Sequence, residues 1–426
     1  MKRGSLFVSI AGIKGMNDVL PGEVETWQFL ENQARSIFGN YGFAEIRVPV
    51  VEKTELFCRS IGETTDIVEK EMYTFEDKSG NSLTLRPEGT APVMRSYIQN
   101  KLYAQDPVAK LYYMGPMFRY ERPQKGRYRQ FHQIGVEAIG IEDPKIDAQV
   151  LAMLSHFFAA VGIEDVSLQI NSLGCPECRP GYRSALITYL QERLGKLCAD
   201  CQRRYQSNPM RVLDCKVPDC KQATADAPSV LDNLCGNCEA HFGQVQQSLR
   251  DLEIPFAVNP RMVRGLDYYT KTAFEMVTGS LGAQNAVAAG GRYDGLIKDL
   301  GGPALPGIGF AMGVERLVLM LGDNKLAPSR PDLFLAALGA EAARETFRIM
   351  SGLQRRGLHA EMDYEGRSLK AQLRRADKLR SRYVLILGED ELARKQATLR
   401  DMEAGTQEEV PLSALEQILL SKLQRA

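Results

Sequence analysis

The chain has 426 residues, 44% of them hydrophobic, with 53 basic and 53 acidic side chains. This length is enough for about three domains with ample apolar cores, and the balanced charge excludes a global field that would draw the whole chain to nucleic acid or to a membrane. The longest nearly apolar stretch, residues 150–163, is too short to span a bilayer, and no cleavage site follows the short apolar start. We therefore expect a cytoplasmic protein without a membrane partner, whose nine cysteines do not form a disulfide framework.

The first part of the chain mixes helical and strand patterns. Residues 23–39 place apolar side chains on one helical stripe, and Gly42 ends that helix well. Apolar residues alternate from 46 to 50, which predicts a strand with an edge or boundary at Pro49. Because strands follow one another by hairpins more often than through helices, the sequence predicts an α+β fold with an antiparallel sheet flanked by helices. Further strands are expected at 71–76, 82–86, 110–115, 167–171, 271–278 and 286–289, and helices at 89–101, 145–160 and, as a buried element, 309–322.

Two composition breaks divide the chain. Residues 172–240 contain eight of the nine cysteines and little strand pattern, which favours a helical insertion. Residues 327–331 (APSRP) are typical of a linker, and an α/β rhythm follows them. We therefore expect a first domain at residues 1–326, a helical cysteine-rich insertion within it at 172–245, and an α/β domain at 331–426. Within the last domain, strands are expected at 333–338, 358–362 and 383–387, and helices at 341–356, 367–380 and near 412–423.

The segment from Phe118 to Glu137 is the most informative one. It predicts a strand, a loop rich in arginine and lysine, and a second strand. Side chains on a strand alternate between its two faces, so one face of the second strand carries Phe131, Gln133, a gap at Gly135, and Glu137. An ordinary hairpin with a solvated basic tip explains the loop charges, but it does not explain this assorted polar face. The loop donors are suited to a polyphosphate.

Several common nucleotide and catalytic motifs are absent from the sequence. It contains no GxxxxGK[ST] phosphate loop, no HExxH and no GxSxG. Gly307-Ile308-Gly309 opens a predicted helix, but it lacks the third glycine and the βαβ unit of a dinucleotide site. Any ATP chemistry must therefore use arginines and an antiparallel sheet.

Four segments together resemble the class II aminoacyl-tRNA synthetases. Phe118-Arg119-x-Glu121 with Arg127-x-x-x-Phe131 resembles motif 2 of that class, and residues 307–316 (GIGFAMGVER) resemble motif 3. Residues 42–49 are similar to motif 1, whose proline lies at the dimer interface. Residues 264–269 (RGLDYY) are similar to the signature of the histidyl-tRNA synthetases, and residues 85–90 (LRPEGT) also match that family.

The resemblance implies a fold, a reaction and a set of site residues. The reaction is the activation of L-histidine by ATP with Mg²⁺ to give histidyl-adenylate and pyrophosphate, followed by transfer of histidine to its tRNA. Arg264 and Arg119 are implied as catalytic residues, at the α-phosphate. The implied ATP-binding residues are Arg119, Glu121, Arg127, Phe131 and Arg316. The implied histidine-binding residues are Glu88, Thr90, Arg119, Gln133, Glu137, Arg264, Tyr268 and Tyr269.

The family also implies contacts with tRNA and with a second copy of the chain. The domain at 331–426 would bind the anticodon, and Arg374 and Lys378 lie on a basic face of one of its predicted helices. Arg122, Gln124 and Lys125 of the motif 2 loop are candidates for contact with the acceptor end of the tRNA. Motif 1 implies a homodimer.

Plain structural roles compete for several of these residues. Glu88 and Thr90 could simply begin a helix, because acidic residues favour its first turn. Tyr268 and Tyr269 could be core aromatics with satisfied hydroxyl groups. A buried arginine needs an anionic partner, and for Arg316 the neighbouring Glu315 could supply it.

The cysteines leave two alternatives open. The pairs at 175/178, 198/201, 215/220 and 235/238 fit tetrahedral Zn²⁺, and eight thiolates could form two structural sites. Unliganded cysteines buried in a helical insertion are the other possibility, so no metal ligand is assigned from the sequence.

Two other functions compete with a synthetase. One is the non-catalytic, histidine-sensing regulatory subunit of ATP phosphoribosyltransferase, which shares the catalytic fold but typically lacks the C-terminal domain and degrades the arginine set. The other is a zinc-dependent nucleic-acid-binding protein based on the cysteine cluster, which leaves RGLDYY unexplained.

Overall fold

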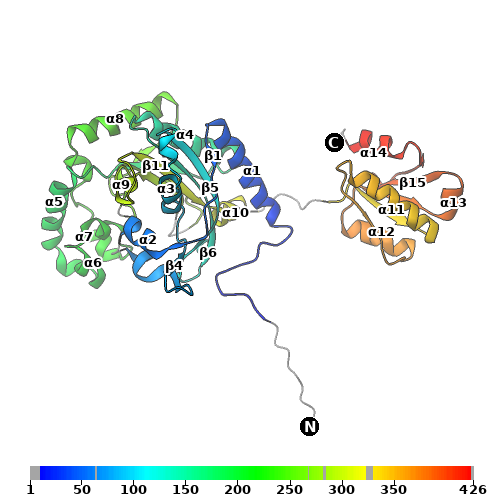
Figure 1. Cartoon of the computed structure of the whole chain (residues 1–426), viewed down its shortest axis with the longest axis horizontal. Coiled ribbons are helices and arrows are strands. Elements are labelled where there is room, and N and C mark those ends of the chain that lie inside the picture. The colour runs from blue at the N-terminus through cyan, green and yellow to red at the C-terminus, as the bar shows by residue number, and fades with distance from the viewer. Residues whose placement is uncertain (1–9, 63–64, 267, 282–284, 323–329, 424–426) are drawn as a thin grey trace, which may run out of the picture. The chain divides into compact units, whose positions relative to one another are not determined.

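The computed structural model describes residues 10–62, 65–266, 268–281, 285–322 and 330–423. The chain divides into two compact units, Met1–Leu326 and Ala327–Ala426. Each unit is built around its own sheet (Figure 1). Most of the expected linker at 327–331 lies outside the described residues.

An eight-stranded sheet forms the centre of the first unit. Its neighbouring strands run antiparallel, except for the outermost pair at each edge, which is parallel. This confirms the expected antiparallel sheet. In spatial order the strands are β1 (Ala44–Glu45), β5 (Ala109–Phe118), β6 (Gln130–Ile139), β11 (Gly307–Gly313), β10 (Ala286–Arg292), β9 (Thr270–Val277), β7 (Ser167–Ser172) and β8 (Ala257–Val258).

Four helices pack on one face of this sheet and form the main apolar core with it. The apolar stripe predicted for the first helix is its buried face, and it includes Trp27, Leu30 and Phe38. Ile134 and Val136 of β6 point into the same core, so the other face of β6 is left for polar side chains. The four helices are α1 (Val24–Asn40), α4 (Lys145–Ala160), α8 (Gly236–Asp251) and α10 (Val314–Leu321).

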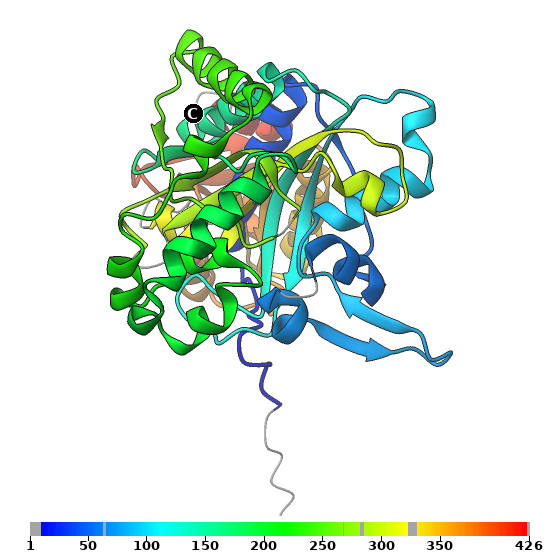
Figure 2. The same ribbon diagram turned by 90° about the vertical axis from the view of Figure 1, so that its left-hand side faces the viewer.

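Smaller elements cover part of the opposite face. Helices α3 and α9 pack on it through Met94, Tyr97 and Ile297, beside Tyr113 of β5. A three-stranded sheet lies next to them, in the blue part of the ribbon in Figure 2. These elements are α2 (Thr54–Ile61), a π-helix (Ile67–Glu71), α3 (Thr90–Gln99), a 3-10 helix (Leu102–Ala104), α9 (Leu296–Asp299), and strands β2 (Val51–Lys53), β4 (Ser82–Leu85) and β3 (Tyr73–Glu76).

Between β7 and β8 the described chain contains helices joined by turns and no strand (green in Figure 1), and a helical insertion was expected here. Its short helices enclose a small core of their own around Tyr182, Leu186 and Leu190. Before α8 they are α5 (Arg179–Gln191), η3 (Leu194–Lys196), α6 (Ala199–Arg204), η4 (Pro209–Asp214), α7 (Pro218–Ala223) and η5 (Val230–Asn233).

The second unit is an α/β fold, as predicted. Its strands pair in the order β13-β12-β14-β15-β16; the first three are parallel and the last two extend the sheet antiparallel. The sequence pattern missed β15, β16 and the short helix α13. The elements are β12 (Leu333–Ala337), α11 (Ala340–Gln354), β13 (Ala360–Met362), α12 (Leu369–Lys378), β14 (Tyr383–Leu387), α13 (Glu389–Ala393), β15 (Gln396–Asp401), β16 (Gln407–Pro411) and α14 (Leu415–Leu423).

Two predicted elements were wrong. Residues 309–322 are not one helix: strand β11 runs through Gly309 to Gly313, and only then does α10 begin. Glycine is a poor helix former, and Gly309 lies so close to β6 that a side chain there would collide with the backbone of Val136. The strand expected at 46–50 is also absent, because Pro49 interrupts it and the guanidinium of Arg86 binds the carbonyl oxygen of Val48 at 3.0 Å.

No helix within the described ranges is long and apolar enough to cross a membrane.

Candidate active site

A cavity of about 440 Å³ opens on the face of the sheet that carries the polar side of β6. It is bordered by β5, β6, β9, β10 and β11, by the start of α3, and by the segment that contains RGLDYY. Every ATP- or histidine-binding residue inferred from the sequence lines it, except Glu137. The sequence-predicted residues in its wall are Glu88, Thr90, Arg119, Glu121, Arg127, Phe131, Gln133, Arg264, Tyr268, Tyr269 and Arg316.

The gap at Gly135 has a steric cause. A Cβ atom there would lie 2.4 Å from the Tyr113 hydroxyl oxygen, so only glycine allows this ring to cross β6. Gly309, opposite Glu137 on β11, has the same function, because a Cβ there would lie 2.1 Å from the Glu137 carboxylate. Two glycines therefore provide the space for the tyrosine and the carboxylate at the floor of the cavity.

Glu137 adjoins the cavity through residues of its wall. Its side chain is buried, and its Oε2 accepts a hydrogen bond from the hydroxyl of Tyr293, which does line the cavity. Burial is the main cause that raises the pKa of Glu137 to about 8. Its Oε1 has no hydrogen-bond partner among the described residues, and this leaves an acceptor for a donor on a ligand.

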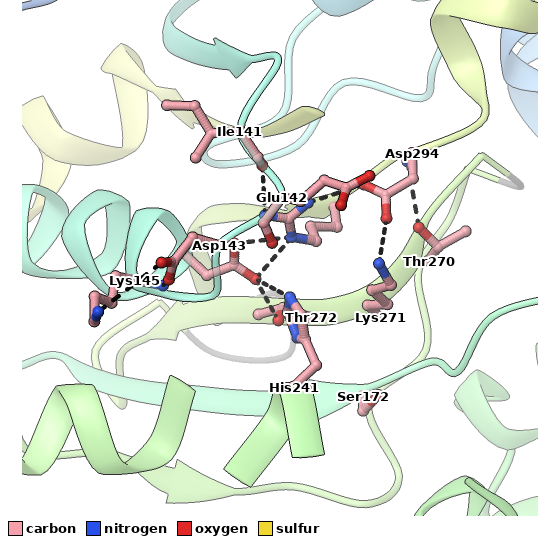
Figure 3. Close-up of polar contacts among 12 residues, drawn as sticks. Ile141, Glu142, Asp143, Lys145, Ser172, His241, Thr270, Lys271, Thr272 and Asp294 are labelled. Atoms are coloured by element: carbon pink, nitrogen blue, oxygen red, sulfur yellow. Dashed lines mark hydrogen bonds and ion pairs between the residues drawn. The ribbon is translucent and has the colours of Figure 1, made fainter. Parts of the chain in front are cut away.

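A buried ionic network fixes the strand end from which Tyr293 projects. Arg292 is fully buried and its Nε donates to Asp147 at 2.9 Å, while its Nη1 donates to Asp294 at 3.0 Å. Thr272 also donates to Asp147, at 2.6 Å. Figure 3 shows that Thr272, Lys271 and Asp294 converge in this network together with His241. The flanking residues hold Tyr293 in place toward Glu137.

Arg119 lies directly after β5, at the edge of the cavity. Its Nε donates to the carbonyl of Pro87 at 2.9 Å, and its guanidinium lies 5.4 Å from the ring centre of Phe131. Burial is the main cause that lowers its pKa, although an arginine stays charged at neutral pH. Since no ion pair involves Arg119 within the described part of the chain, its terminal nitrogens can bind an anion in the cavity.

Glu121 and Arg127, both of motif 2, form an ion pair with each other. A second carboxylate, that of Glu71, lies 3.8 Å from the Nη2 of Arg127. ATP binding by Glu121 and Arg127, as implied by the resemblance, therefore requires this pair to separate.

The carboxylate of Glu315, the possible anionic partner of Arg316, is bonded to another residue. Glu315 instead accepts hydrogen bonds from the backbone and the ring of His132, at 2.9 and 3.1 Å. Arg316 donates to the carbonyl oxygens of Gly126 and Ala286 and lines the cavity. Its guanidinium thus lies in the cavity wall, where it is suited to bind an anionic ligand.

Arg264 enters the cavity from the RGLDYY segment. Its Nη1 lies 2.5 Å from Glu275 on β9, and its guanidinium lies 5.2 Å from the ring centre of Tyr269. Glu275 lines the cavity as well. One member of the segment, Asp267, lies outside the described residues.

Glu88 has the structural role that competed with ligand binding. Its carboxylate accepts the backbone N–H groups of Thr90 and Ala91, at 2.6 and 2.9 Å, at the start of α3. The same side chain lines the cavity, and burial raises its pKa. Tyr268 and Tyr269 likewise pack in apolar clusters and still face the cavity. In all three residues a packing role and a place in the cavity wall coexist.

The residues inferred to contact tRNA are all exposed. Arg122, Gln124 and Lys125 lie at the tip between β5 and β6. Arg374 and Lys378 lie on α12 of the second unit, whose buried residues are Gln372 and Ala376.

Sequence reasoning missed several residues of the cavity wall. Tyr113 was identifiable in principle, because the antiparallel register places it opposite Gly135. Glu275 alternates with buried residues on β9. Tyr293 and Asp214 carry no local signal, because only the tertiary fold places them beside the cavity.

The cysteines of the insertion form two groups of four. In each group the four sulfur atoms lie within 4.8 Å of one another. The groups are Cys175, Cys178, Cys235 and Cys238, and Cys198, Cys201, Cys215 and Cys220.

Comparisons with known proteins agree with the geometry of the cavity. A family model described as histidyl-tRNA synthetase matches residues 15–317, and one described as an anticodon binding domain matches residues 332–422. The chain is 73% identical to a histidine–tRNA ligase of Syntrophotalea carbinolica over 97% of its own length and 99% of the relative. It is 68% identical to one of Geobacter metallireducens, over 95% and 97%.

Solved structures give the same result. The crystal structure of the apo histidyl-tRNA synthetase of S. aureus matches with a TM-score of 0.82 and 38% identity, and the match covers 96% of this chain and all of that one. A structure from Bacillus halodurans titled as an ATP phosphoribosyltransferase regulatory subunit/histidyl-tRNA synthetase matches with a TM-score of 0.64 at 20% identity, which shows a shared fold alone.

Proposed function

Since the chain belongs to the histidyl-tRNA synthetase family, it is an ATP-dependent aminoacyl-tRNA synthetase that joins histidine to tRNA, and we propose that the cavity beside β6 carries both steps of this reaction. In the first step a histidine carboxylate oxygen attacks the α-phosphorus of ATP, which forms histidyl-adenylate and releases pyrophosphate. In the second step a hydroxyl group at the 3′ end of the tRNA takes the histidyl group and AMP leaves.

One observation carries the proposal. Arg119, Arg127, Arg264 and Arg316 come from four separate segments and line a single cavity. Arg119 forms no ion pair within the described chain, and the aromatic ring of Phe131 lies beside it. Such convergence of guanidinium groups is suited to a polyphosphate with a planar base.

Within this cavity the arginines bind different parts of the ATP molecule. Arg119 binds the α-phosphate and the histidine carboxylate, and its planar guanidinium matches two oxygens. Arg127 and Arg316 bind the terminal phosphates, and Phe131 stacks on adenine. Arg264 stabilises the charge that develops at the α-phosphate, as a fixed positive group with a largely buried side chain. The ion pairs that Arg127 and Arg264 form with Glu121 and Glu275 release as the nucleotide binds.

The polar end of the cavity binds histidine. Glu88, Thr90 and Gln133 lie together near its floor and bind the α-amino group. Glu137 accepts one imidazole N–H through its unpaired oxygen, while Tyr268 or Tyr269 serves the other ring nitrogen. A site that leaves its own polar groups unpaired when the wrong ligand binds rejects analogues by roughly 10⁴–10⁵.

Mg²⁺ enters this reaction with ATP. Three of the cavity carboxylates have partners that the nucleotide does not displace: Glu88 is bonded to the start of α3, Glu315 to His132 and Asp214 to Lys216. This donor set fits an ion held chiefly by the phosphates of the nucleotide, as is usual for Mg²⁺. When bound, the ion neutralises phosphate charge.

The domain boundaries and the macromolecular contacts are part of the proposal. Residues 1–326 form the catalytic domain, with the insertion at 172–245, and residues 331–426 form the anticodon-binding domain; the two compact units and the ranges of the two family models support this division. Arg122, Gln124 and Lys125 contact the acceptor end of the tRNA. The residues of motif 1 contact a second copy of the chain in a cytoplasmic homodimer.

Histidine-dependent exchange of labelled pyrophosphate into ATP tests the function. We expect exchange with histidine and with no other standard amino acid. Absence of exchange by folded protein that still binds histidine would instead favour the regulatory-subunit function. The 73% identity to a histidine–tRNA ligase and the intact arginine set stand against that alternative.

The anticodon surface has its own test. Arg374 and Lys378 are exposed on one face of α12, so replacing both with Gln should weaken tRNA binding and lower its salt slope by about one to two units. Replacing Arg344 on α11 and Lys395, just before β15, is the matched control in the same unit. Unchanged affinity and slope in the Arg374/Lys378 variant would place the surface elsewhere.

A further inference from the structure

We propose that the insertion contains two structural Zn²⁺ sites of four thiolates each, nested one inside the other along the chain. The outer site consists of Cys175, Cys178, Cys235 and Cys238, and the inner site consists of Cys198, Cys201, Cys215 and Cys220. Neither site belongs to the reaction cavity.

The sulfur geometry fits a single tetrahedral ion in each group. Four thiolates about 2.3 Å from Zn²⁺ lie about 3.8 Å from one another. The Sγ atom of Cys175 lies 3.6 Å from that of Cys178 and 3.8 Å from that of Cys235, while Cys198 and Cys215 are 3.9 Å apart. Disulfide-bonded sulfurs lie about 2.05 Å apart, and the four sulfurs of a four-iron cluster bind separate irons and need wider spacing.

Backbone N–H groups in both sites point at the sulfurs. The N–H of Cys235 donates to the Sγ of Cys178, and that of Cys198 donates to the Sγ of Cys220, each at 3.1 Å. Donors of this kind stabilise negative charge on sulfur and orient it, as the second shell of a metal site does. In each group two cysteines are buried and two are half-buried, which gives a site closed to a fifth ligand.

The outer site closes the base of the insertion. Cys175 comes three residues after the end of β7, and Cys235 stands at the start of α8. Gly174 has φ +66°, and a Cβ there would lie 2.8 Å from the Cβ of Cys178, so the chain turns tightly into the site. One ion would thus join two chain segments 60 residues apart and stabilise the fold against a long open loop.

The inner site would stabilise the insertion, whose own apolar core is small. Within the described residues the insertion has no strand between β7 and β8, and its apolar cluster rests on short helices around Tyr182, Leu186 and Val212. Cys201 and Cys220 belong to this cluster. Small helical units with few large apolar residues usually require a metal or a disulfide. Soft thiolate ligands select Zn²⁺ over Mg²⁺ or Ca²⁺.

The insertion also contacts the segment that carries Arg264. Arg211 donates to the carbonyl of Gly265 at 3.1 Å, and Arg179, the residue after Cys178, donates to that of Tyr269. Lys271 donates to the carbonyl of Gly174 at 2.9 Å. Loss of metal should therefore loosen one wall of the cavity as well as the insertion.

Elemental analysis of the full chain purified without added metal tests the proposal. We expect two zinc ions per chain. Cys178→Ser and Cys220→Ser should each retain one zinc ion, and the double variant none. Cys58→Ser, at the one cysteine outside both groups, is the matched control and should retain two. Limited proteolysis after chelation in denaturant and refolding should cut within residues 175–238 and spare the sheet.

Each other outcome contradicts a definite part of the proposal. Less than about 0.2 zinc ions per chain, together with nine titratable thiols in denaturant, would contradict the proposal of both zinc sites. Four disulfides per chain would replace them with a covalent framework. Iron with visible absorption, found in place of zinc, would contradict the assignment of zinc as the bound metal. Loss of both zinc ions from the single variants, in chains that gel filtration shows to be folded, would overturn the division into two independent sites.

Discussion

The floor of the cavity and the insertion beside it hold polar residues in place by different means. The floor belongs to an eight-stranded sheet whose reverse face is covered by α1, α4, α8 and α10. There, strand pairing and apolar packing are extensive enough to bury an arginine, an aspartate and a glutamate completely. The insertion has short helices and a small core, and its arginines reach the RGLDYY segment from half-buried positions. The comparison shows that a large apolar core can bury charged side chains, whereas a small core needs additional cross-links between its chain segments.

The largest effect should come from breaking the buried network of the floor. Asp147→Ala removes one of the two carboxylates paired with the buried Arg292, and also the acceptor of the Thr272 hydroxyl, and should lower the free energy of unfolding by about 3–5 kcal/mol. Asp200→Ala removes an exposed ion pair with Arg203 in the insertion and should change it by less than about 1 kcal/mol. Denaturant unfolding of both variants measures the difference. Similar effects in the two variants would contradict the distinction drawn between the regions.

Arg264 lies where the two regions meet, and its removal should affect chemistry more than stability. Arg264→Ala should lower histidine-dependent pyrophosphate exchange by roughly 10²–10³, the usual loss for one preorganised donor. The exposed Arg250 of α8 offers a control substitution that should leave exchange unchanged. A near-normal rate in the Arg264→Ala protein would remove its role at the α-phosphate.

The pH dependence of stability should report the buried carboxyl group of the floor. Burial raises the pKa of Glu137 to about 8 in the folded chain, from an ordinary value near 4.5. Between these values the unfolded chain has lost a proton that the folded chain keeps, so this group's contribution to stability, complete below pH 4.5, is lost as the pH rises to about 8. The loss is on the order of a few kcal/mol.

Glu137→Gln should abolish this part of the pH dependence. We expect the difference in unfolding free energy between the variant and the parent chain to shift in favour of the variant from pH 5 to pH 9. Glu142→Gln, an exposed carboxylate at the end of the same hairpin, should show no such trend. A difference independent of pH would mean that Glu137 is ionised throughout.

The smallest effect should come from the contacts of the insertion with the RGLDYY segment. Arg211→Ala removes one hydrogen bond to Gly265 and should cost about 1 kcal/mol, seen as a roughly fivefold lower kcat/KM for histidine. Arg183→Ala removes hydrogen bonds of the same kind to Gln206 and Ser207 within the insertion, without touching that segment. If both variants lower kcat/KM equally, the insertion acts on the cavity only through its overall stability.

The local sequence pattern predicted most of the helices and strands, but it failed where glycines let two strands approach closely. The helix over 145–160 was predicted to the residue, because its apolar positions repeat with the helical period. Residues 309–322 gave an apolar pattern that suits a buried strand or a helix equally well, and only the close approach of β6 to β11 decides for a strand up to Gly313. Strands β15 and β16 were missed because they bury few apolar side chains, Ala397 and Leu399 in β15 and Val410 in β16.

The sequence by itself determined which residue types line the cavity, because the alternation along β6 and the RGLDYY signature depend only on local order. Only the tertiary structure decided how those groups are paired before a ligand arrives: Glu121 with Arg127, Arg264 with Glu275, and Glu137 with Tyr293. It also decided which cysteines share a group of four, since spacing along the chain allows several partitions. The physical reason is that charge pairing and metal geometry depend on distances across the fold, and residues far apart in sequence acquire those distances only when the sheet and the insertion have packed.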